Sequence, residues 1–199
     1  MKHAIAFAAA ALLSTSALAA DRYEFDKEHT RILFFVNHLG YSDMVGEFTD
    51  YDGFFTFDEK APETSSVDVS LKPAGIRTSS KALDEKLQSD EWFKSAQFPE
   101  IRFKSTGIKT TGANTGEVMG TVTMLGVSKP VMLKVKLNKA DFNSYAGAFV
   151  AGFSADATLK RSDFGMSAYV PAVGDEVRIH IETEGVNVDR KKRDALKKS

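Results

Sequence analysis

The stretch HTRILFFVNHLG, residues 29–40, decides the fold of this chain. It predicts a β-strand, because side chains alternate between the two faces of a strand and both faces here are apolar. One face carries Ile32, Phe34, Val36 and His38, and the other carries Leu33 and Phe35. Such a strand needs a core on one side and a second layer or a bound apolar molecule on the other. This need is the first indication that the protein holds something hydrophobic.

Several later segments alternate with period two, which is typical of half-buried strands. We expect long strands at 117–125, 131–137, 149–159 and 177–183, and shorter ones at 53–57, 66–71 and 100–105. Eight or nine antiparallel strands joined by short turns favour a closed all-β barrel, which leaves no sheet edge exposed. Small residues on the apolar faces predict spare space inside it: Gly120, Ala151, Ala155 and Ala157.

A short helical insertion interrupts the strands at about 79–95. Ser79 or Ser80 can cap a helix here, and apolar side chains then recur one turn apart on a single face. The helix is too short and polar to form a core layer. We expect the following side chains to pack over one end of the barrel: Leu83, Leu87, Trp92 and Phe93.

The first 19 residues have the features of a secretory signal peptide. Lys2 precedes an apolar run from Ala4 to Leu13, and Ala17-Leu18-Ala19 forms an Ala-x-Ala cleavage site before Ala20. The run is too short for a permanent membrane span. We therefore expect export to the bacterial periplasm and a mature chain without disulfides, because the sequence contains no cysteine.

Charge divides the remainder into a body, residues 20–188, and a basic tail, residues 189–199. The side chains of the body carry a net charge of −6 and those of the tail +4. The acidic body argues against nucleic-acid binding. The tail is interpreted as a solvated, frayed terminus, or alternatively as a weak contact with anionic lipid headgroups.

Catalytic signatures are missing, so we expect no catalytic residue, no cofactor and no metal site. There is no phosphate-binding glycine loop, no His-Glu-x-x-His helix and no Gly-x-Ser-x-Gly turn. Outside the signal segment the histidines are His29, His38 and His180, whose spacing matches no standard metal site. His180 reads as a solvated residue, His29 as bound to backbone or a carboxylate at the rim, and His38 as either a core residue or a polar group at a cavity mouth.

The segment KRSDFGMSAYVP, residues 160–171, is a second dense cluster. One interpretation is a loop fastened by an ion pair between Arg161 and Asp163, with Phe164 and Met166 in the core. The other is a mobile lip over a cavity, in which the flexible thioether of Met166 adapts to an irregular apolar ligand. The two interpretations are compatible.

Several motifs, taken in order, resemble the YceI-like proteins over about residues 22–186. The matching segments are His29–Gly40, Gly46-x-Phe48, Phe98–Thr106, Gly126–Val131, Arg161–Met166 and Gly174–Val177. One departure is Ser128, where threonine is common before Lys-Pro. The resemblance implies a lipocalin-like eight-stranded antiparallel barrel, a periplasmic location, stress induction in some members, and a long polyisoprenoid or similar lipid in the lumen. The basic tail lies outside the family pattern.

A lipid-binding barrel over residues 20–188 is the leading hypothesis, with a polyprenyl phosphate or an isoprenoid quinone as ligand. An enzyme acting on such a lipid and a structural barrel with a filled lumen are the alternatives, and a homodimer stays open. The predicted ligand-binding residues are Ile32, Phe34, Val36, His38, Val67, Val69, Leu83, Leu87, Phe93, Ile101, Phe103, Val118, Val122, Met124, Phe149, Phe153, Arg161, Phe164 and Met166.

Overall fold

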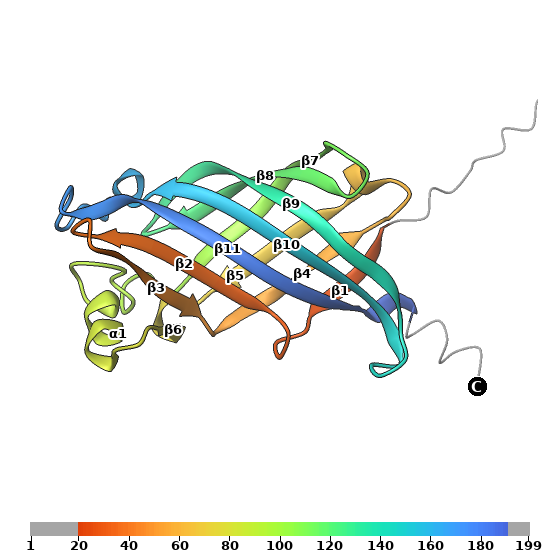
Figure 1. Cartoon of the computed structure of the whole chain (residues 1–199), viewed down its shortest axis with the longest axis horizontal. Helices are drawn as coiled ribbons and strands as arrows, with labels where there is room; N and C mark the ends of the chain where they lie inside the picture. The colour runs from red at the N-terminus through yellow and green to blue at the C-terminus, as the bar shows by residue number, and fades with distance from the viewer. Residues whose placement is uncertain (1–19, 191–199) are drawn as a thin grey trace, which may run out of the picture.

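A computed structural model describes residues 20–190, and its strands form one closed antiparallel sheet (Figure 1). The predicted signal peptide and residues 191–199 of the predicted tail lie outside the described residues. The strands are β1 (Asp21–Phe25), β2 (Arg31–His38), β3 (Ser42–Phe48), β4 (Tyr51–Phe57), β5 (Ser66–Leu71), β6 (Ile76–Arg77), β7 (Ile101–Thr110), β8 (Thr115–Met124), β9 (Val127–Asn143), β10 (Ala148–Lys160) and β11 (Val173–Asn187). The helices are α1 (Lys81–Gln88) and the 3₁₀ turns η1 (Pro62–Thr64), η2 (Pro73–Gly75) and η3 (Arg161–Phe164).

These eleven segments make eight barrel strands, because three of the eight are broken in two. β1 and β2 lie end to end along β11, while β4 pairs with β1 and β3 with β2. β5 and β6 continue in the same way along β4 and β3. Each barrel strand therefore pairs with its neighbours in sequence, and the pairing of β1 and β2 with β11 closes the ring. The predicted eight-stranded, lipocalin-like barrel is confirmed.

Two of the breaks are fastened to each other. The backbone N–H of Lys72 donates to the carbonyl of Asp50 (2.8 Å), and that of Thr49 donates to the carbonyl of Gly75 (3.1 Å). Gly75 is required here, since a Cβ on it would lie 2.5 Å from the Cβ of Asp50. The sequence analysis missed β1, β3 and β6, whose short or polar segments carry little alternation.

Inside the barrel, phenylalanine rings lie against glycines of the neighbouring, paired strand. A Cβ on Gly46 would meet the ring of Phe34 at 2.1 Å, and one on Gly120 would meet the ring of Phe103 at 2.3 Å. The prediction that Gly120 and Ala151 mark spare space is therefore wrong. The Phe103 ring fills the first position, and Ala151 is fully buried in an aromatic cluster.

The outer face of β2 has no second layer over it, contrary to our expectation. Leu33 and Phe35 are half-buried on the outside of the barrel. The guanidinium carbon of Arg178 lies 5.2 Å from the centre of the Phe35 ring. Neighbouring long side chains thus cover this apolar face in place of a layer, as amphipathic stems commonly do.

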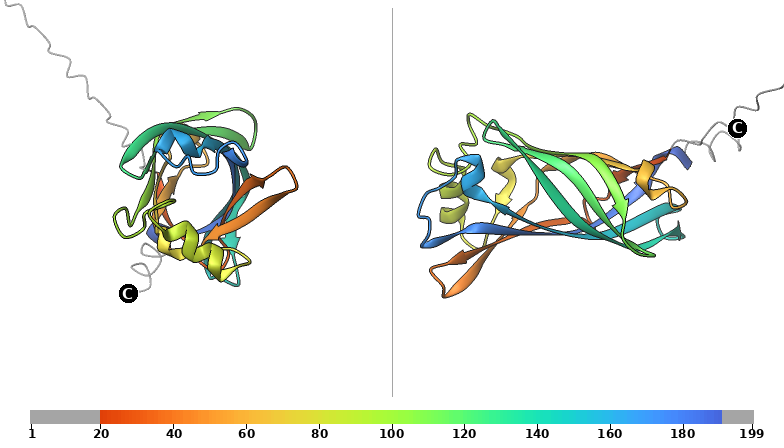
Figure 2. Two further views of the ribbon diagram at one scale, coloured as in Figure 1. Left: turned by 90° about the vertical axis from the view of Figure 1, so that its left-hand side faces the viewer. Right: turned by 90° about the horizontal axis from the view of Figure 1, so that it is seen from above.

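The two ends of the barrel differ. At the capped end, α1 and the turns that follow it lie across the opening (Figure 2), together with the β10–β11 connection. Ser80 caps the helix by accepting a hydrogen bond from Leu83 N (3.4 Å). At the open end, the short turns 111–114 and 144–147 and the longer connection 58–65, which contains η1, join neighbouring strands (Figure 1). Among residues 20–190, no helix is long and apolar enough to cross a bilayer.

Candidate functional site

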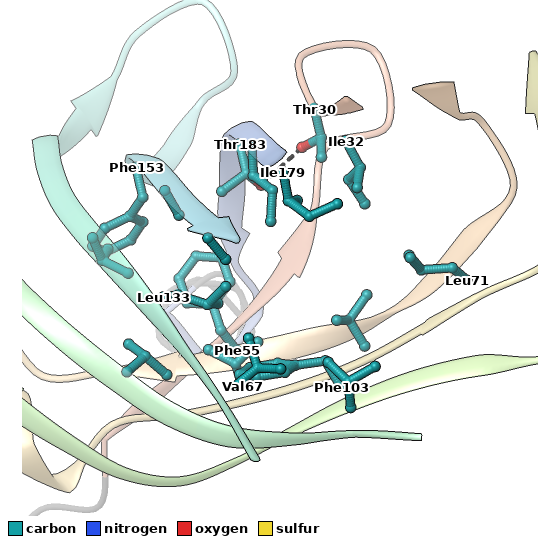
Figure 3. A pocket seen from close by; sticks show the side chains of 18 of the residues that line it. Thr30, Ile32, Phe55, Val67, Leu71, Phe103, Leu133, Phe153, Ile179 and Thr183 are labelled. Atoms are coloured by element: carbon teal, nitrogen blue, oxygen red, sulfur yellow. Dashed lines mark hydrogen bonds between the residues drawn. The ribbon is translucent and has the colours of Figure 1, made fainter. Parts of the chain in front are cut away.

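An elongated apolar cavity of about 530 Å³ occupies the barrel lumen (Figure 3). Its lining includes 15 of the 19 predicted ligand-binding residues. They are Ile32, Phe34, Val36, Val67, Val69, Leu87, Phe93, Ile101, Phe103, Val118, Val122, Met124, Phe153, Arg161 and Met166. Ala155 and Ala157 also line it, so the small side chains of β10 do leave space. Most of the predicted residues on strands thus face the cavity, because alternate residues of a barrel strand face inward.

Four predicted residues lie outside the lining. His38 ends β2 at the capped end, far from the exposed part of the lining, so it is not at the cavity mouth. Leu83 is half-buried against the apolar core, and Phe164 is buried within that core. Phe149 shares the inward face of β10 but lies beyond the end of the lumen, where Phe142 and Arg190 contact its ring.

The few hydroxyl groups in the middle of the lumen are already hydrogen-bonded. The Oγ1 atoms of Thr30 and Thr183 lie 2.9 Å apart, as the dashed line in Figure 3 shows. The Tyr51 hydroxyl donates to the carbonyl of Thr30 (3.4 Å). Thr56 shares a hydrogen bond with Ser66 (2.9 Å). Since these groups satisfy one another, the surface they present to the cavity is essentially hydrocarbon.

Within residues 20–190, the solvent-exposed part of the cavity lining lies at the open end alone. Every solvent-exposed residue of its lining belongs to the 58–65 or the 110–115 segment: Glu59, Thr110, Gly112, Ala113, Asn114 and Thr115. At the capped end the lining side chains are buried or half-buried. The lumen is therefore a blind tube with one mouth.

The pairing of β5 with β7 explains why the mouth lies there. β5 pairs only with residues 101–104 of β7, although β7 continues to residue 110. The register of β7 against β8 also shifts between Ser105 and Gly107, and such an irregularity bends a strand. The β7–β8 hairpin thus leaves its neighbour, and η1 lies beside it, with the Thr110 hydroxyl donating to Glu63. The mouth opens in this gap.

A buried arginine holds the capped end together. Arg161 is 2% exposed, and it donates from Nε to the carbonyl of Gly174 (2.8 Å), from Nη1 to that of Met166 (2.9 Å) and from Nη2 to that of Val173 (2.9 Å). Burial lowers the pKa of its guanidinium, and the nearby Asp175 partly offsets this effect.

The predicted ion pair between Arg161 and Asp163 is wrong. Asp163 is exposed, while Arg161 points inward to backbone carbonyls. The carboxylate that fastens this connection is instead Asp175, which accepts hydrogen bonds from the backbone N–H (2.9 Å) and hydroxyl (2.8 Å) of Ser162. The physical reason is that backbone carbonyls satisfy the buried guanidinium, while the Asp163 side chain stays in solvent.

Two cations and two rings form a stack across the capped end. Lys86 of α1 lies 4.5 Å from the ring centre of Tyr169, which stacks on Trp92 at 6.2 Å with an interplanar angle of 16°. Arg161 lies on Trp92, with its guanidinium carbon 5.2 Å from the ring. The stack joins the helical insertion to the β10–β11 connection. The indole Nε1 of Trp92 is buried and has no hydrogen-bond partner.

Aromatic side chains fill the other side of the open end. Tyr23 stacks on Phe55 (5.1 Å), and Phe153 meets the edges of Phe55 (5.5 Å) and Phe57 (5.2 Å). Such edge-to-face pairs are favourable beyond the area they bury. They close the lumen along β1, β4 and β10 and so confine the mouth to the side of β5, β7 and β8.

None of the three histidines of the described residues lines the cavity. His29 binds Asp26 (2.9 Å), as expected for a rim residue, and this hydrogen bond raises the pKa of His29. His180 is half-buried on the outer wall, where it binds Asp156 (2.7 Å) and Glu182 (3.1 Å). The side-chain atoms of Asp26, His29 and Glu184 that could bind a metal ion lie within 4.8 Å of one another. Asp26 and His29 are already hydrogen-bonded to each other.

Sequence reasoning missed the residues of the mouth and the hydroxyl groups of the lumen. Thr30 precedes β2, and Thr183 lies between two glutamates within β11, so neither belongs to an apolar run. The exposed residues of the 58–65 segment carried no recognised signal. Nothing in the sequence of the 111–114 turn indicates that it borders a cavity.

The profile of the YceI-like domain matches residues 23–185 of this chain. Among curated proteins, a UPF0312 protein of Pseudomonas savastanoi pv. phaseolicola is 38% identical over 185 residues, which cover 92% of this chain and 95% of that protein. A UPF0312 protein of Pseudomonas aeruginosa is 37% identical, with the same coverage of both chains.

Solved structures share the fold. The YceI protein of Campylobacter jejuni is 30% identical with a TM-score of 0.70, and the match covers 76% of this chain and 89% of that one. BcnA of Burkholderia cenocepacia has a TM-score of 0.74 at 20% identity, covering 80% of this chain and 98% of that one. A polyisoprenoid binding domain from Saccharophagus degradans has a TM-score of 0.66 at 10% identity, covering 83% and 98%. The last two matches show likeness of fold alone.

Proposed function

This chain belongs to the YceI-like family, and from that premise we propose that it binds the apolar chain of a polyisoprenoid lipid in its lumen. The observation that carries the proposal is the blind, hydrocarbon-lined cavity of about 530 Å³, which is within the range of small-molecule sites. Each five-carbon isoprene unit moved from water into it contributes up to about 4 kcal/mol, at roughly 0.8 kcal/mol per carbon. A few units therefore suffice for stable retention after binding costs are subtracted.

A binding role fits this lumen better than catalysis does. The described residues place no histidine in the cavity lining, and the ionisable side chains among them that line it are Tyr51, Glu59 at the mouth and Arg161 at the blind end. Burial raises the pKa of the Tyr51 hydroxyl, which donates to the carbonyl of Thr30. Arg161 already donates to three carbonyls. His38 and Asp163 both lie outside the lining. General acid–base chemistry needs groups within reach of the substrate.

The ligand's polar headgroup is proposed to lie at the mouth, with the chain directed toward Trp92. The mouth offers exposed polar groups on Thr110, Asn114 and Thr115, whereas the middle of the lumen offers only hydroxyls that are already paired. An apolar tube discriminates weakly between chains of similar girth. The headgroup thus decides between a polyprenyl phosphate and an isoprenoid quinone, and both fit the proposal.

Native mass spectrometry of the purified protein, followed by organic extraction, tests lumen occupancy. We expect a bound mass that the extract identifies as a polyisoprenoid. Ala157→Phe fills the lumen from β10 and should remove that mass, whereas Thr158→Phe adds the same ring to the outer wall and should retain it. A lipid that survives Ala157→Phe, in a protein with unchanged circular dichroism, would contradict binding in the lumen.

The carrier role is proposed for the periplasm. The Ala-x-Ala sequence before Ala20 supports export, because it follows an apolar run of signal-peptide length. Cell fractionation should place the protein in the periplasmic extract, and N-terminal sequencing should begin at Ala20. A periplasmic protein that retains Met1 would refute cleavage at this site.

A further inference from the structure

We propose that the open end of the barrel docks on an anionic bilayer surface, so that the mouth of the lumen faces the membrane. The inference extends the proposed function to the place where lipid would be exchanged. Vesicle binding and lumen occupancy are measured separately, so that either can fail without the other.

The β9–β10 hairpin presents aromatic rings to solvent at this end. Phe142 is half-exposed and Tyr145 is fully exposed. The side chain of Asn143 accepts hydrogen bonds from the backbone of Tyr145 (2.9 Å) and Ala146 (3.2 Å), which fixes the turn. A rigid turn holding amphipathic rings in water gains from contact with the bilayer interface, where aromatic residues prefer to lie.

The basic tail begins beside these rings. Arg190 donates from Nε to Asp21 (2.8 Å) and from its backbone N–H to Asn187 (2.8 Å). Its guanidinium carbon lies 4.2 Å from the centre of the Phe149 ring, and Phe149 contacts Phe142 with their ring centres 5.6 Å apart. A continuous set of contacts therefore leads from the hairpin rings to the residue after which the tail continues.

The charges of the chain point to an anionic surface as the partner. Residues 191–199 contain five basic side chains and one acidic one, while residues 20–188 carry a net charge of −6. Basic clusters are attracted to anionic headgroups, and the acidic body is repelled by them. Only the end that carries the tail can approach such a surface, which orients the barrel. A basic cluster and a pair of inserting rings also supply the two signals that stable, reversible membrane binding requires.

The segments that border the mouth lie at the same end of the barrel as the β9–β10 hairpin and the end of β11, after which the tail begins (Figures 1 and 2). Lys60 and Lys109 are exposed on its two bordering segments, where Glu59 and Glu63 balance their charge, so the net attraction to anionic headgroups comes from the tail. Docking in this orientation lets an apolar chain pass between bilayer and lumen with little exposure to water. Exposure of the apolar chain to water would otherwise dominate the free-energy barrier to its transfer between bilayer and lumen.

The capped end supplies a matched control. Leu39 is half-exposed and Tyr41 almost fully exposed at the tip of the β2–β3 hairpin, but no run of basic residues accompanies them. If exposed rings alone were sufficient, this end would bind bilayers equally well. The proposal requires that it does not.

Sedimentation with vesicles tests the proposal, using phosphatidylcholine with and without phosphatidylglycerol. We expect the protein to bind only the phosphatidylglycerol vesicles, and less as salt rises. Deleting residues 191–199 should weaken binding by about tenfold or more. The double variant Phe142→Ser/Tyr145→Ser should weaken it by roughly threefold or more, whereas Leu39→Ser/Tyr41→Ser should leave it unchanged.

Two results would overturn the docking proposal. One is equal binding to vesicles with and without phosphatidylglycerol, or no binding to either. The other is loss of binding in Leu39→Ser/Tyr41→Ser with retention in the tail deletion, which would place the contact at the capped end. A fluorescence measurement fixes the orientation, because the chain has a single tryptophan, the buried Trp92. Brominated phosphatidylglycerol should quench the added indole of Tyr145→Trp and leave Trp92 emission unchanged.

Discussion

The capped end and the open end of this barrel are closed by opposite kinds of chemistry. At the capped end, a charge is buried among backbone carbonyls and sealed by stacked rings from two distant segments. At the open end, the segments that border the mouth are exposed and share single hydroxyl contacts, such as Thr110 with Glu63. Buried hydrogen bonds and packed rings rigidify a structure, whereas exposed contacts break at little cost.

This difference indicates which end moves. A ligand that enters or leaves through the capped end must break the Arg161 hydrogen bonds and separate Trp92 from Tyr169. A ligand that uses the mouth displaces only exposed segments. Local opening favours regions with few buried contacts, so we expect exchange at the open end and stability to depend on the capped end.

The largest expected effect is the loss of the buried arginine. Arg161→Ala should lower the free energy of unfolding by about 3 kcal/mol or more, because three buried carbonyls lose their donors. Arg190→Ala at the open end should cost less than about 1 kcal/mol, since its partner contact is partly exposed. Urea denaturation measures both values. Arg161→Lys keeps the charge without the planar guanidinium and should recover only part of the lost stability. Equal losses of stability in Arg161→Ala and Arg190→Ala would contradict the conclusion that the capped end carries more of the stability.

A charge on the aromatic side of the lumen should have the next largest effect. Phe153→Asp places a carboxylate among Phe55 and Phe57 and should cost about 2 kcal/mol. It should also abolish lipid co-purification, because the cavity would have to hold water around the charge. His180→Ala, on the outer wall of the adjacent strand, should retain the lipid. Equal lipid occupancy in the two folded variants would show that Phe153 does not border the bound chain.

A change at the mouth should affect exchange more than stability. Thr110→Val removes the hydroxyl contact with Glu63 and should lower stability by less than about 1 kcal/mol. The rate at which a fluorescent isoprenoid leaves the lumen should nevertheless rise. Thr123→Val is the control, because it deletes a comparable exposed contact, with Ser128 (2.8 Å), at the other end. If both variants release the ligand at the wild-type rate, the mouth is not the exit.

The smallest expected effect is a pH dependence of stability that arises from His180, on the outer wall of the barrel between the two ends. The hydrogen bond with Asp156 raises the pKa of His180 above its ordinary 6.5, and Glu182 adds to this. A raised pKa in the folded state means that the stabilisation is complete below pH 6.5 and is lost as the pH rises through the folded value. Because the side chain is 36% exposed, screening limits the effect to a few tenths of a kcal/mol. His180→Asn should flatten this part of the stability profile, measured by urea titration at several pH values, and an unchanged slope would assign it to another group.

Alternation along the strands was enough to predict which face of several strands turns toward the lumen. Ile32, Phe34 and Phe153 were placed correctly because a barrel strand has one inside and one outside, and the choice repeats every two residues. The same reasoning failed for Gly120, where a side chain from the neighbouring strand fills the space that the glycine leaves. It also failed for Phe149, because periodicity carries no information about where the barrel ends.

The sequence by itself therefore determined the fold class, the family resemblance and the apolar character of the interior, since these follow from local alternation and from motifs in fixed order. Only the tertiary structure decided which end of the barrel is open, which carbonyls Arg161 binds and which segments meet across the caps. Those features depend on contacts between distant parts of the chain, such as Trp92 with Tyr169 and Glu63 with Thr110. These contacts form because closure of the sheet brings distant segments together, and no local pattern of residues encodes that closure.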